Sequence, residues 1–291
     1  MTVAVAGATG ALGREVVRQL AARGMTVRAF GRGAARLAAL PAQETRLFDL
    51  RPPGPPAGAC EGVNALILCA GASMRLGGWR DRISFHEADY LGNLRLLAEA
   101  KRSGVERLVY VSLAGALAVR HTAFAQAHER FVQALEASGI PACVVRPTGL
   151  FHVFAALLRP AAWGAGIVTG HGQARTNPIH EADAARACLE ALECRERQMI
   201  VGGPEIFTRE RLAELPFEAL GRPPRVWHVP ASALRAAAVP LGWANPRLGA
   251  LLAFGAAAGE VDLTAPAYGT RRLGDYLRER AATLGAERAP A

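Results

Sequence analysis

Four polar side chains in the middle of the chain are candidates to exchange a proton with a bound molecule: Ser112, His121, His128 and His152. Histidine titrates near neutral pH, and a serine hydroxyl can hydrogen-bond a carbonyl oxygen. His121 and His128 are seven residues apart, so they share a face if one helix holds both. Each of the four could equally be a core or surface residue without chemistry, so the pattern supplies candidates for catalysis rather than a motif.

A glycine-rich loop near the start of the chain has the spacing of a phosphate-binding turn. Residues 7–13 read Gly-Ala-Thr-Gly-Ala-Leu-Gly, directly after an apolar run and directly before a helical pattern. The first two glycines permit a tight turn and close approach of a pyrophosphate, and the third permits close packing of helix on strand. The alternative is a glycine turn without a ligand. We expect a dinucleotide to contact Gly7, Thr9, Gly10, Ala11, Leu12 and Gly13.

The end of the second expected strand bears on which dinucleotide binds. Sites selective for NAD usually place Asp or Glu there, whereas this chain has Arg32. An arginine can pair with the additional phosphate of NADP, and the missing carboxylate removes a repulsion. We therefore expect NADP(H) in preference to NAD(H), the alternative being that Arg32 is only a solvated loop residue.

Further candidates follow the later strands, because ligands of such sheets lie at the carboxyl ends of the strands. The expected cofactor contacts are Asp49, Leu50, Cys69, Ala70 and Gly71. The expected substrate contacts are Ser73, Met74, Arg75, Trp79 and Phe151. Arg75 could meet an anionic group, although loop residues such as Arg75 and Asp49 could equally have no ligand.

A parallel sheet is needed to bring these positions together. The chain alternates short β-branched runs with longer helical patterns, which is typical of βαβ units. Strands are expected at 2–6, 26–30, 45–48, 65–69, 107–112, 142–146 and 199–201. Helices are expected between them at 12–23, 88–103 and 125–138, and later at 209–220, 231–239, 246–258 and 271–281, with an extended piece at 225–229.

These elements predict an α/β fold: a Rossmann-type, doubly wound parallel sheet with a smaller, mostly helical C-terminal substrate lobe. Residues 1–205 would form the NAD(P)-binding domain, with an insertion near 149–180 that belongs to the substrate lobe. Residues 206–291 would form the lobe itself.

Composition excludes several classes of protein. With 51% hydrophobic residues in 291, the chain can bury a sizeable core and is not disordered. Of 34 basic residues against 25 acidic ones, only Lys101 is a lysine, and the arginines are spread along the chain, so we expect no nucleic-acid partner. The chain leaves no room for a signal peptide and has no apolar stretch of membrane-spanning length, so no membrane partner is expected.

The five cysteines are widely spaced and contain no Cys-x-x-Cys, which argues against disulfides and a metal site. We expect a cytoplasmic protein, either a monomer or a homodimer, that binds a small-molecule substrate.

Further motifs appear in a fixed order after the glycine loop. They are Asp89-Tyr90-Leu91-Gly92-Asn93, Val109-Tyr110-Val111-Ser112, Arg146-Pro147-Thr148-Gly149 and Asn177-Pro178-Ile179-His180-x-x-Asp183. With them the chain resembles the atypical short-chain dehydrogenase/reductase superfamily, in its NmrA-like group. The resemblance implies that Ser112, residue 128 and the backbone of Pro147, Thr148 and Gly149 contact the cofactor, and that His180 and Asp183 fix a loop and cap a helix.

The catalytic pair of that superfamily is missing. Members with the usual chemistry carry Tyr-x-x-x-Lys on the fifth helix, where the lysine lowers the tyrosine pKa and holds the nicotinamide ribose. The corresponding positions here are Phe124 and His128. Phenylalanine has no proton to transfer, and histidine could hydrogen-bond the ribose without being a permanent cation. Lys101 lies on another expected helix and the tyrosines fall elsewhere, so the sequence offers no local substitute.

Three functions remain open. The leading hypothesis is an NAD(P)H-dependent reductase that acts on a small, largely apolar carbonyl or conjugated molecule, with protons from histidine, serine or water. The first alternative is a non-redox isomerase, cyclase or dehydratase on the same fold. The second is a non-enzymatic, NADP-sensing regulator.

Overall fold

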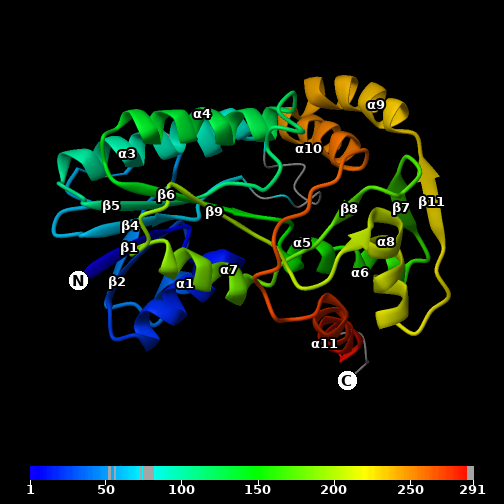
Figure 1. Cartoon of the computed structure of the whole chain (residues 1–291), viewed down its shortest axis with the longest axis horizontal. Helices are drawn as coiled ribbons and strands as arrows, with labels where there is room; N and C mark the ends of the chain where they lie inside the picture. Colours follow the sequence, from blue (N-terminus) through cyan, green and yellow to red (C-terminus); the bar gives the residue numbers. More distant parts are fainter. Residues whose placement is uncertain (52–53, 56, 73, 75–81, 287–291) are drawn as a thin grey trace.

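The computed structural model of the chain describes residues 1–51, 54–55, 57–72, 74 and 82–286, and it is built around one sheet (Figure 1). The strands lie in the order β3-β2-β1-β4-β5-β6-β9, and all neighbours pair in parallel. They are β1 (Thr2–Ala6), β2 (Thr26–Gly31), β3 (Glu44–Leu47), β4 (Ala65–Leu68), β5 (Arg107–Val111), β6 (Ala142–Pro147) and β9 (Gln198–Val201). The direction of strand order reverses between β1 and β4, where ligands of such sheets bind. The predicted α/β fold is confirmed.

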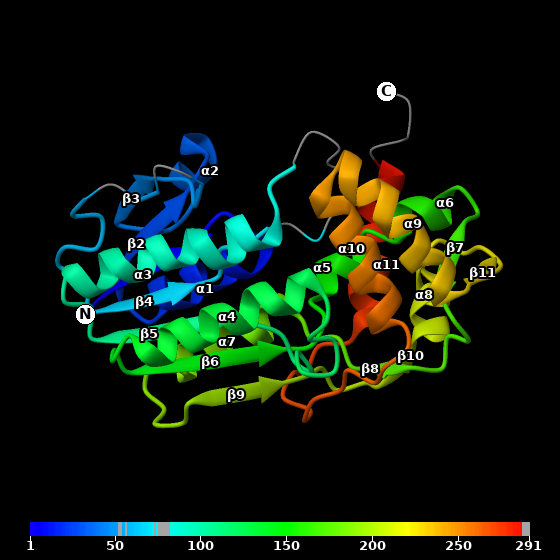
Figure 2. The ribbon, with the colours of Figure 1, turned by 90° about the horizontal axis from the view of Figure 1, so that it is seen from above.

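Helices cover both faces of this sheet (Figures 1 and 2). On one face lie α1 (Ala11–Ala22) and α7 (Glu181–Glu190), which contact each other. On the other face lie α3 (Asn93–Arg102), which continues the π-helical turn η1 (His86–Gly92), and α4 (Ala123–Ala137). The short helix α2 (Ala34–Ala38) follows β2.

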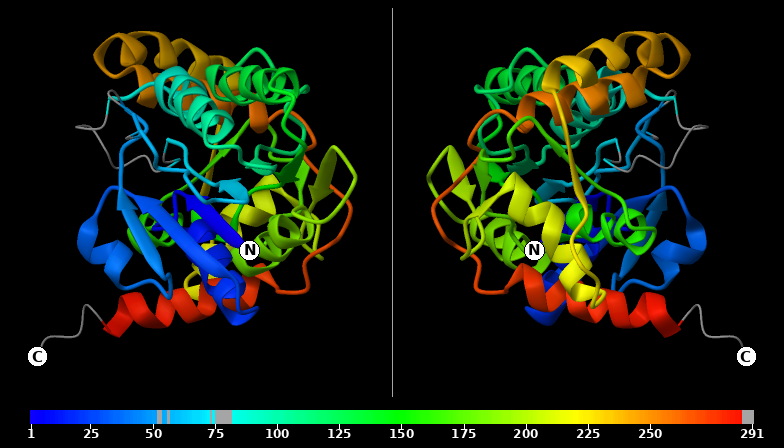
Figure 3. Two further views of the ribbon diagram at one scale, coloured as in Figure 1. Left: turned by 90° about the vertical axis from the view of Figure 1, so that its left-hand side faces the viewer. Right: turned by 90° about the vertical axis from the view of Figure 1, so that its right-hand side faces the viewer.

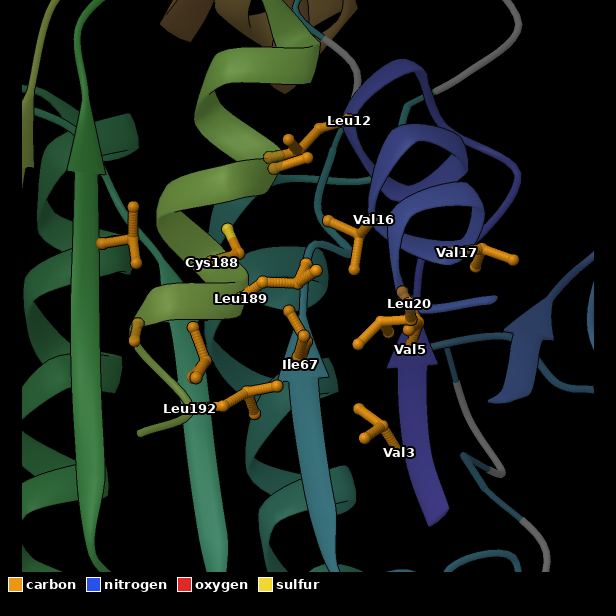
Figure 4. Close-up of a cluster of buried hydrophobic side chains, with 14 of the residues drawn as sticks. Val3, Val5, Leu12, Val16, Val17, Leu20, Ile67, Cys188, Leu189 and Leu192 are labelled. Carbon is orange, nitrogen blue, oxygen red and sulfur yellow. The ribbon is translucent and has the colours of Figure 1, made fainter. Parts of the chain in front are cut away.

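The central strands contribute to a hydrophobic core on each face of the sheet, because successive side chains along a strand point to opposite faces. Val3 and Val5 lie with Leu20 of α1 and Leu189 of α7 in one fully buried cluster (Figure 4). Between them along β1, Ala4 points to the opposite cluster under α3 and α4. Both faces of the sheet are therefore closed to water, and the carboxyl ends of its strands are left to bind a ligand.

The C-terminal lobe lies beyond those carboxyl ends (Figure 2). It contains two small sheets, in which β7 (Gly166–Thr169) pairs with β11 (Val226–Val229) and β8 (Arg175–Thr176) pairs with β10 (Phe207–Thr208). Its helices are α5 (Phe151–Ala155), α6 (Leu158–Ala162), α8 (Arg209–Ala219), α9 (Ala231–Ala244), α10 (Pro246–Ala258) and α11 (Leu273–Ala286). Figure 3 shows α9 and α10 on the side of α3 and α4, and α11 on the side of α1.

Helix α9 is longer than the sequence predicts, because it continues through Pro240 to Ala244. Pro240 and Ala236 both lie on the exposed side of α9, where water can satisfy the carbonyl that a proline leaves unpaired. The exposed side also carries Trp243, which is 82% exposed. Elsewhere in the lobe, Trp163 and Trp227 are 75% and 68% exposed.

Candidate functional site

The loop between β1 and α1 has no room for side chains at two of its glycines. Gly7 adopts a φ of +77°, and a Cβ there would lie 2.8 Å from the backbone N and Cα of Ala70. A Cβ on Gly13 would lie 2.2 Å from the Gly7 carbonyl oxygen. The N–H of Gly10 donates to that same oxygen at 2.9 Å. Glycine is therefore required at position 7, where the turn packs against Ala70 after β4, and at position 13, where α1 packs against the turn.

The first turn of α1 suits an anion. Gly10 precedes the helix without a side-chain cap, and the first turn carries no acidic residue. The N–H groups of that turn and the helix dipole together favour a negative group. Thr9 and Ala11 are half-buried at this turn, while Leu12 is buried in the core. In shape and charge the loop fits a pyrophosphate.

Arg32 follows β2 directly and is exposed. A Cβ on the preceding Gly31 would lie 3.2 Å from Thr9 Cγ2, so the arginine starts beside the phosphate loop. A second exposed arginine, Arg36 on α2, has its Nε 3.2 Å from where a Cβ on Gly33 would lie. Sequence analysis missed Arg36, although its place one turn after Arg32 was a usable signal.

The residues after β3 are held by close neighbours. The Asp49 carboxylate accepts a hydrogen bond from Arg51 Nε at 2.9 Å, and this bond lowers the pKa of Asp49. Leu50 is half-buried beside Gly92, where a Cβ would lie 2.6 Å from Leu50 Cβ. Asp49 is thus engaged in an ion pair, and Leu50 in a packing contact.

The turn after β4 lies against η1. Cys69 donates its N–H to Ala6, and Ala70 approaches the glycine loop. A Cβ on Gly71 would lie 2.2 Å from Asp89 Oδ1. A π-helical turn holds one extra residue and is frequent at functional sites. Here that turn carries Asp89 to the end of β4.

Asp89 is a buried carboxyl group that sequence analysis identified only as part of a motif. Its side chain is 2% exposed and accepts a hydrogen bond from the Ala72 N–H at 3.1 Å. Burial raises the pKa of Asp89 to about 7, although the Ala72 hydrogen bond and the positive charge of Arg247 act in the opposite direction. A carboxyl group with this pKa exchanges its proton near neutral pH.

His128, which the sequence resemblance puts at the position of the superfamily's lysine, is buried on α4. Its Nδ1 lies 2.6 Å from the hydroxyl of Tyr110 on β5, and its Nε2 lies 3.8 Å from Asp89 Oδ1. Burial, together with the charge of Arg146, lowers the pKa of His128 to about 3. Burial also raises the pKa of Tyr110 well above its usual value. Both rings are therefore neutral at physiological pH.

Phe124 lies one turn before His128 and forms an aromatic wall with rings from two other segments. Its ring centroid is 4.7 Å from that of His128, 4.9 Å from Phe85 and 4.8 Å from Phe254 of α10. Met74 belongs to the adjoining apolar cluster. Phe85 is fully buried in this cluster, whereas Phe124 and Phe254 are partly exposed.

Ser112 at the end of β5 is buried and held by an ion pair. The hydroxyl oxygen accepts a hydrogen bond from Arg146 Nη1 at 3.3 Å. Arg146 in turn bridges to Glu129 of α4 at 2.5 Å. Because Arg146 donates to the oxygen, the hydroxyl proton of Ser112 remains available to a ligand.

His152 on α5 pairs with a buried glutamate. Its Nδ1 lies 2.7 Å from Glu181 Oε1, which also accepts the backbone N–H of His152 at 2.8 Å. Burial alone would raise the pKa of Glu181, but the hydrogen bonds from His152 lower it below its usual value. The half-exposed imidazole is therefore held by an ionised carboxylate.

The turn after β6 is fixed by backbone contacts. Thr148 donates its hydroxyl to the Asn177 carbonyl at 2.5 Å, and the Pro147 carbonyl accepts the Ala114 N–H at 2.9 Å. The Gly149 carbonyl accepts the Ile179 N–H at 2.9 Å. The Thr148 side chain is thus engaged within the protein.

His180 and Asp183, two polar residues of the last sequence motif, hold the start of α7 and a neighbouring loop. His180 precedes α7 and accepts the Ala182 N–H through Nδ1 at 3.0 Å. Asp183 accepts hydrogen bonds from Arg271 and from the backbone N–H of Thr270. These contacts match the roles of helix cap and loop anchor.

Two sequence interpretations do not fit the structure. His121 does not share a helix face with His128, because α4 begins at Ala123 behind the N-cap Thr122 and leaves His121 exposed in the preceding turn. Phe151 is 1% exposed in the lobe core, where it contacts Tyr276 and so does not line an open pocket. Three further expected substrate contacts, Ser73, Arg75 and Trp79, lie outside the described residues.

The described ranges contain neither a metal-binding cluster nor a membrane-spanning helix. No cluster of three or more His, Cys, Asp or Glu side chains there could hold a metal ion. No helix in the same ranges has the length and hydrophobicity to cross a membrane.

Comparison with known proteins places this site in a family. Residues 7–195 match the model of the NAD(P)H-binding family. Over 122 residues, 41% of this chain and 36% of the relative, the chain is 42% identical to sterol demethylase protein B of Methylococcus capsulatus. It is 31% identical to divinyl chlorophyllide a 8-vinyl-reductase of Oryza sativa, over 81% of this chain and 63% of that protein. The chain therefore spans less than two thirds of the length of these curated relatives.

A solved structure shares the whole architecture. The NADPH-dependent quinone oxidoreductase of Escherichia coli, solved in complex with NADPH, superposes with a TM-score of 0.68 at 21% identity, covering 97% of this chain and 99% of that one. This likeness supports the fold. Since the family model covers most of the chain, including the phosphate loop and the strands β2 to β6, the chain belongs to the NAD(P)H-binding family.

Proposed function

We propose that this protein is an NADPH-dependent reductase of an apolar carbonyl or conjugated substrate. The observation that carries the proposal is the presence, at the carboxyl ends of two strands of one parallel sheet, of a phosphate loop that admits only glycine at Gly7 and Gly13 and of a Ser112 hydroxyl oriented by Arg146; the two strands, β1 and β5, are separated by β4 alone. The loop binds the dinucleotide, and the hydroxyl binds the substrate oxygen.

The cofactor side of the site consists of the β1–α1 turn and of the exposed arginines that follow β2. The backbone of the β1–α1 turn holds the pyrophosphate, and Arg32, assisted by Arg36, holds the additional phosphate of NADPH. A bound reduced nicotinamide supplies the hydride. His128 donates a hydrogen bond to the ribose without adding a charge.

The proton comes from a different histidine. His128 cannot serve as the acid, because its pKa of about 3 leaves the imidazole neutral, with a proton on only one of its two nitrogens, at neutral pH. His152 is half-exposed and hydrogen-bonded to the ionised Glu181, an arrangement that orients the imidazole. Ser112 bonds the substrate oxygen while His152 delivers the proton.

The substrate class follows from the aromatic wall. Phe124 and Phe254 are in ring contact and partly exposed, which favours a flat, apolar molecule. Relatives named for a chlorophyllide vinyl reduction and for sterol demethylation agree with a large ring system. We include the C-terminal lobe, residues 206–291 with the segment 149–180, as the substrate-binding part, because β7 and β8 of that segment pair with β11 and β10.

The test has two stages. Binding of NADPH and NADH to purified protein is measured by calorimetry, and then NADPH oxidation is followed with quinones, enones, polycyclic ketones and vinyl-substituted tetrapyrroles. Oxidation coupled to a reduced product supports the proposal. Product formation without NADPH turnover indicates a non-redox enzyme. Tight NADPH binding without turnover across the panel contradicts the reductase and favours a sensor.

A further inference from the structure

The contact between Tyr110 and His128 determines where the proton sits on the imidazole. Tyr110 Oη and His128 Nδ1 are 2.6 Å apart, and both side chains are buried. Either atom could donate in principle, because a neutral imidazole carries its proton on one of two nitrogens. The surroundings of Tyr110 distinguish the two directions.

Within the ranges that the structure describes, Tyr110 Oη has no second hydrogen-bond partner. If His128 donated from Nδ1, the Tyr110 hydroxyl proton would be buried without an acceptor, which is costly. The opposite direction satisfies both groups: Tyr110 O–H donates and Nδ1 accepts. The single proton of the neutral ring must then lie on Nε2.

The Nε2–H group is the free end of this arrangement. His128 Nε2 lies on the side of the ring that faces Asp89, but its distance of 3.8 Å from Asp89 Oδ1 is longer than a hydrogen bond. Among the described residues this N–H donor has no hydrogen-bond acceptor, and it is presented where the superfamily's lysine would present its ammonium group. The charge of Arg146, together with burial, disfavours a second cation at this place.

The geometry points to Tyr110 as a positioning residue: its hydroxyl fixes His128 as the Nε2–H tautomer, so that the site offers the cofactor ribose an uncharged donor in place of lysine. This inference rests on the proposed function only for the identity of the ribose acceptor. The tautomer itself is a property of the protein without ligand.

The direct experiment is ¹⁵N NMR of the histidine rings in the ligand-free protein, with His128 assigned through a His128→Gln variant. We expect the His128 spectrum to show a bare Nδ1 and a protonated Nε2, and this tautomer to persist as Asp89, 3.8 Å from Nε2, ionises near neutral pH. A protonated Nδ1 in the wild-type protein overturns the inference, whatever the variants do.

The second measurement uses Tyr110→Phe, with Tyr90→Phe as the matched control because Tyr90 lies nearby on η1 and its ring contacts that of His86. In Tyr110→Phe the Nδ1–H tautomer should appear, and NADPH should bind about three- to tenfold more weakly, the range of one lost hydrogen bond. Tyr90→Phe should change neither readout. An unchanged tautomer in a folded Tyr110→Phe protein also contradicts the inference.

The two hypotheses fail separately. If wild-type protein binds no dinucleotide but shows the Nε2–H form, the proposed function fails and the positioning role of Tyr110 stands. If NADPH binds and His128 carries its proton on Nδ1, the cofactor assignment stands and the positioning role fails.

Discussion

Arg146 of β6 and Glu129 of α4 form an ion pair at 2.5 Å, with the two side chains only 12% and 24% exposed. The same guanidinium nitrogen donates to Ser112, so the pair fixes the hydroxyl that we assign to the substrate. Glu129→Gln leaves the guanidinium charge without its counter-ion in a partly buried place, and should lower the free energy of unfolding by about 2 kcal/mol.

Denaturant unfolding checks this value, and kcat/KM should fall together with stability because Ser112 loses its orientation. Glu15→Gln serves as the control, since the Glu15–Arg18 pair at 2.6 Å lies on the surface of α1 and should contribute less than about 1 kcal/mol. Equal losses of unfolding free energy in Glu129→Gln and Glu15→Gln would contradict a special role for the ion pair between Arg146 and Glu129.

Gly13 should be the most sensitive position of the phosphate loop. A Cβ there meets the Gly7 carbonyl oxygen at 2.2 Å, and the contact is backbone that cannot move without opening the turn. Gly13→Ala should cost about 1–3 kcal/mol of stability and weaken NADPH binding by more than about tenfold. In Gly10→Ala the corresponding distance is 3.2 Å, so a milder effect in calorimetry and thermal unfolding is expected.

Arg32 should set the preference between the two dinucleotides. Its guanidinium is proposed to meet the additional phosphate that only NADPH carries, so Arg32→Ala should weaken NADPH binding about tenfold and leave NADH binding unchanged. Arg23→Ala, an exposed arginine at the far end of α1, is the control. Parallel loss of both cofactors would contradict this assignment.

Asp89 should make stability depend on pH near neutrality. Burial raises its folded-state pKa to about 7, far above the usual 3.8, so the folded protein holds this proton more tightly than the unfolded chain. The contribution of Asp89 is therefore present at low pH and lost as the pH rises through 7, when the buried carboxylate must ionise beside His128, Tyr110 and Arg247.

Asp89→Asn removes this titration and keeps an oxygen for the Ala72 N–H. The variant should gain about 2 kcal/mol relative to wild type between pH 5 and pH 8, measured by urea unfolding at both pH values. Asp275→Asn on the surface of α11 should show little change between the two conditions. If the free energy of unfolding of Asp89→Asn differs from that of wild type by the same amount at pH 5 and at pH 8, the carboxyl group has an ordinary pKa.

The sequence was sufficient for features that depend on neighbours along the chain. The glycine loop and the positions of the seven strands along the chain follow from local spacing and from the alternation of strand and helix. The N-cap Thr122 was also visible, and its capping preference would have excluded His121 from α4.

Features that depend on contacts between distant segments were not predictable. Tyr110 and His128 meet only because β5 lies under α4, and nothing in their spacing indicates it. Asp89 could not be distinguished from a surface carboxylate before the π-helical turn placed it against Gly71. An aromatic residue after a strand, such as Phe151, looks alike in sequence whether it lines a pocket or fills a core.

The exposed indoles give this protein an uneven optical response. Trp163, Trp227 and Trp243 all lie in the C-terminal lobe and are at least 68% exposed, and no tryptophan stands in the seven-stranded sheet. Their emission therefore reports on the solvent around the lobe, whereas far-ultraviolet circular dichroism reports on the whole backbone. Because these three indoles already contact water in the folded protein, unfolding of the lobe should change their emission far less than it changes the circular dichroism signal.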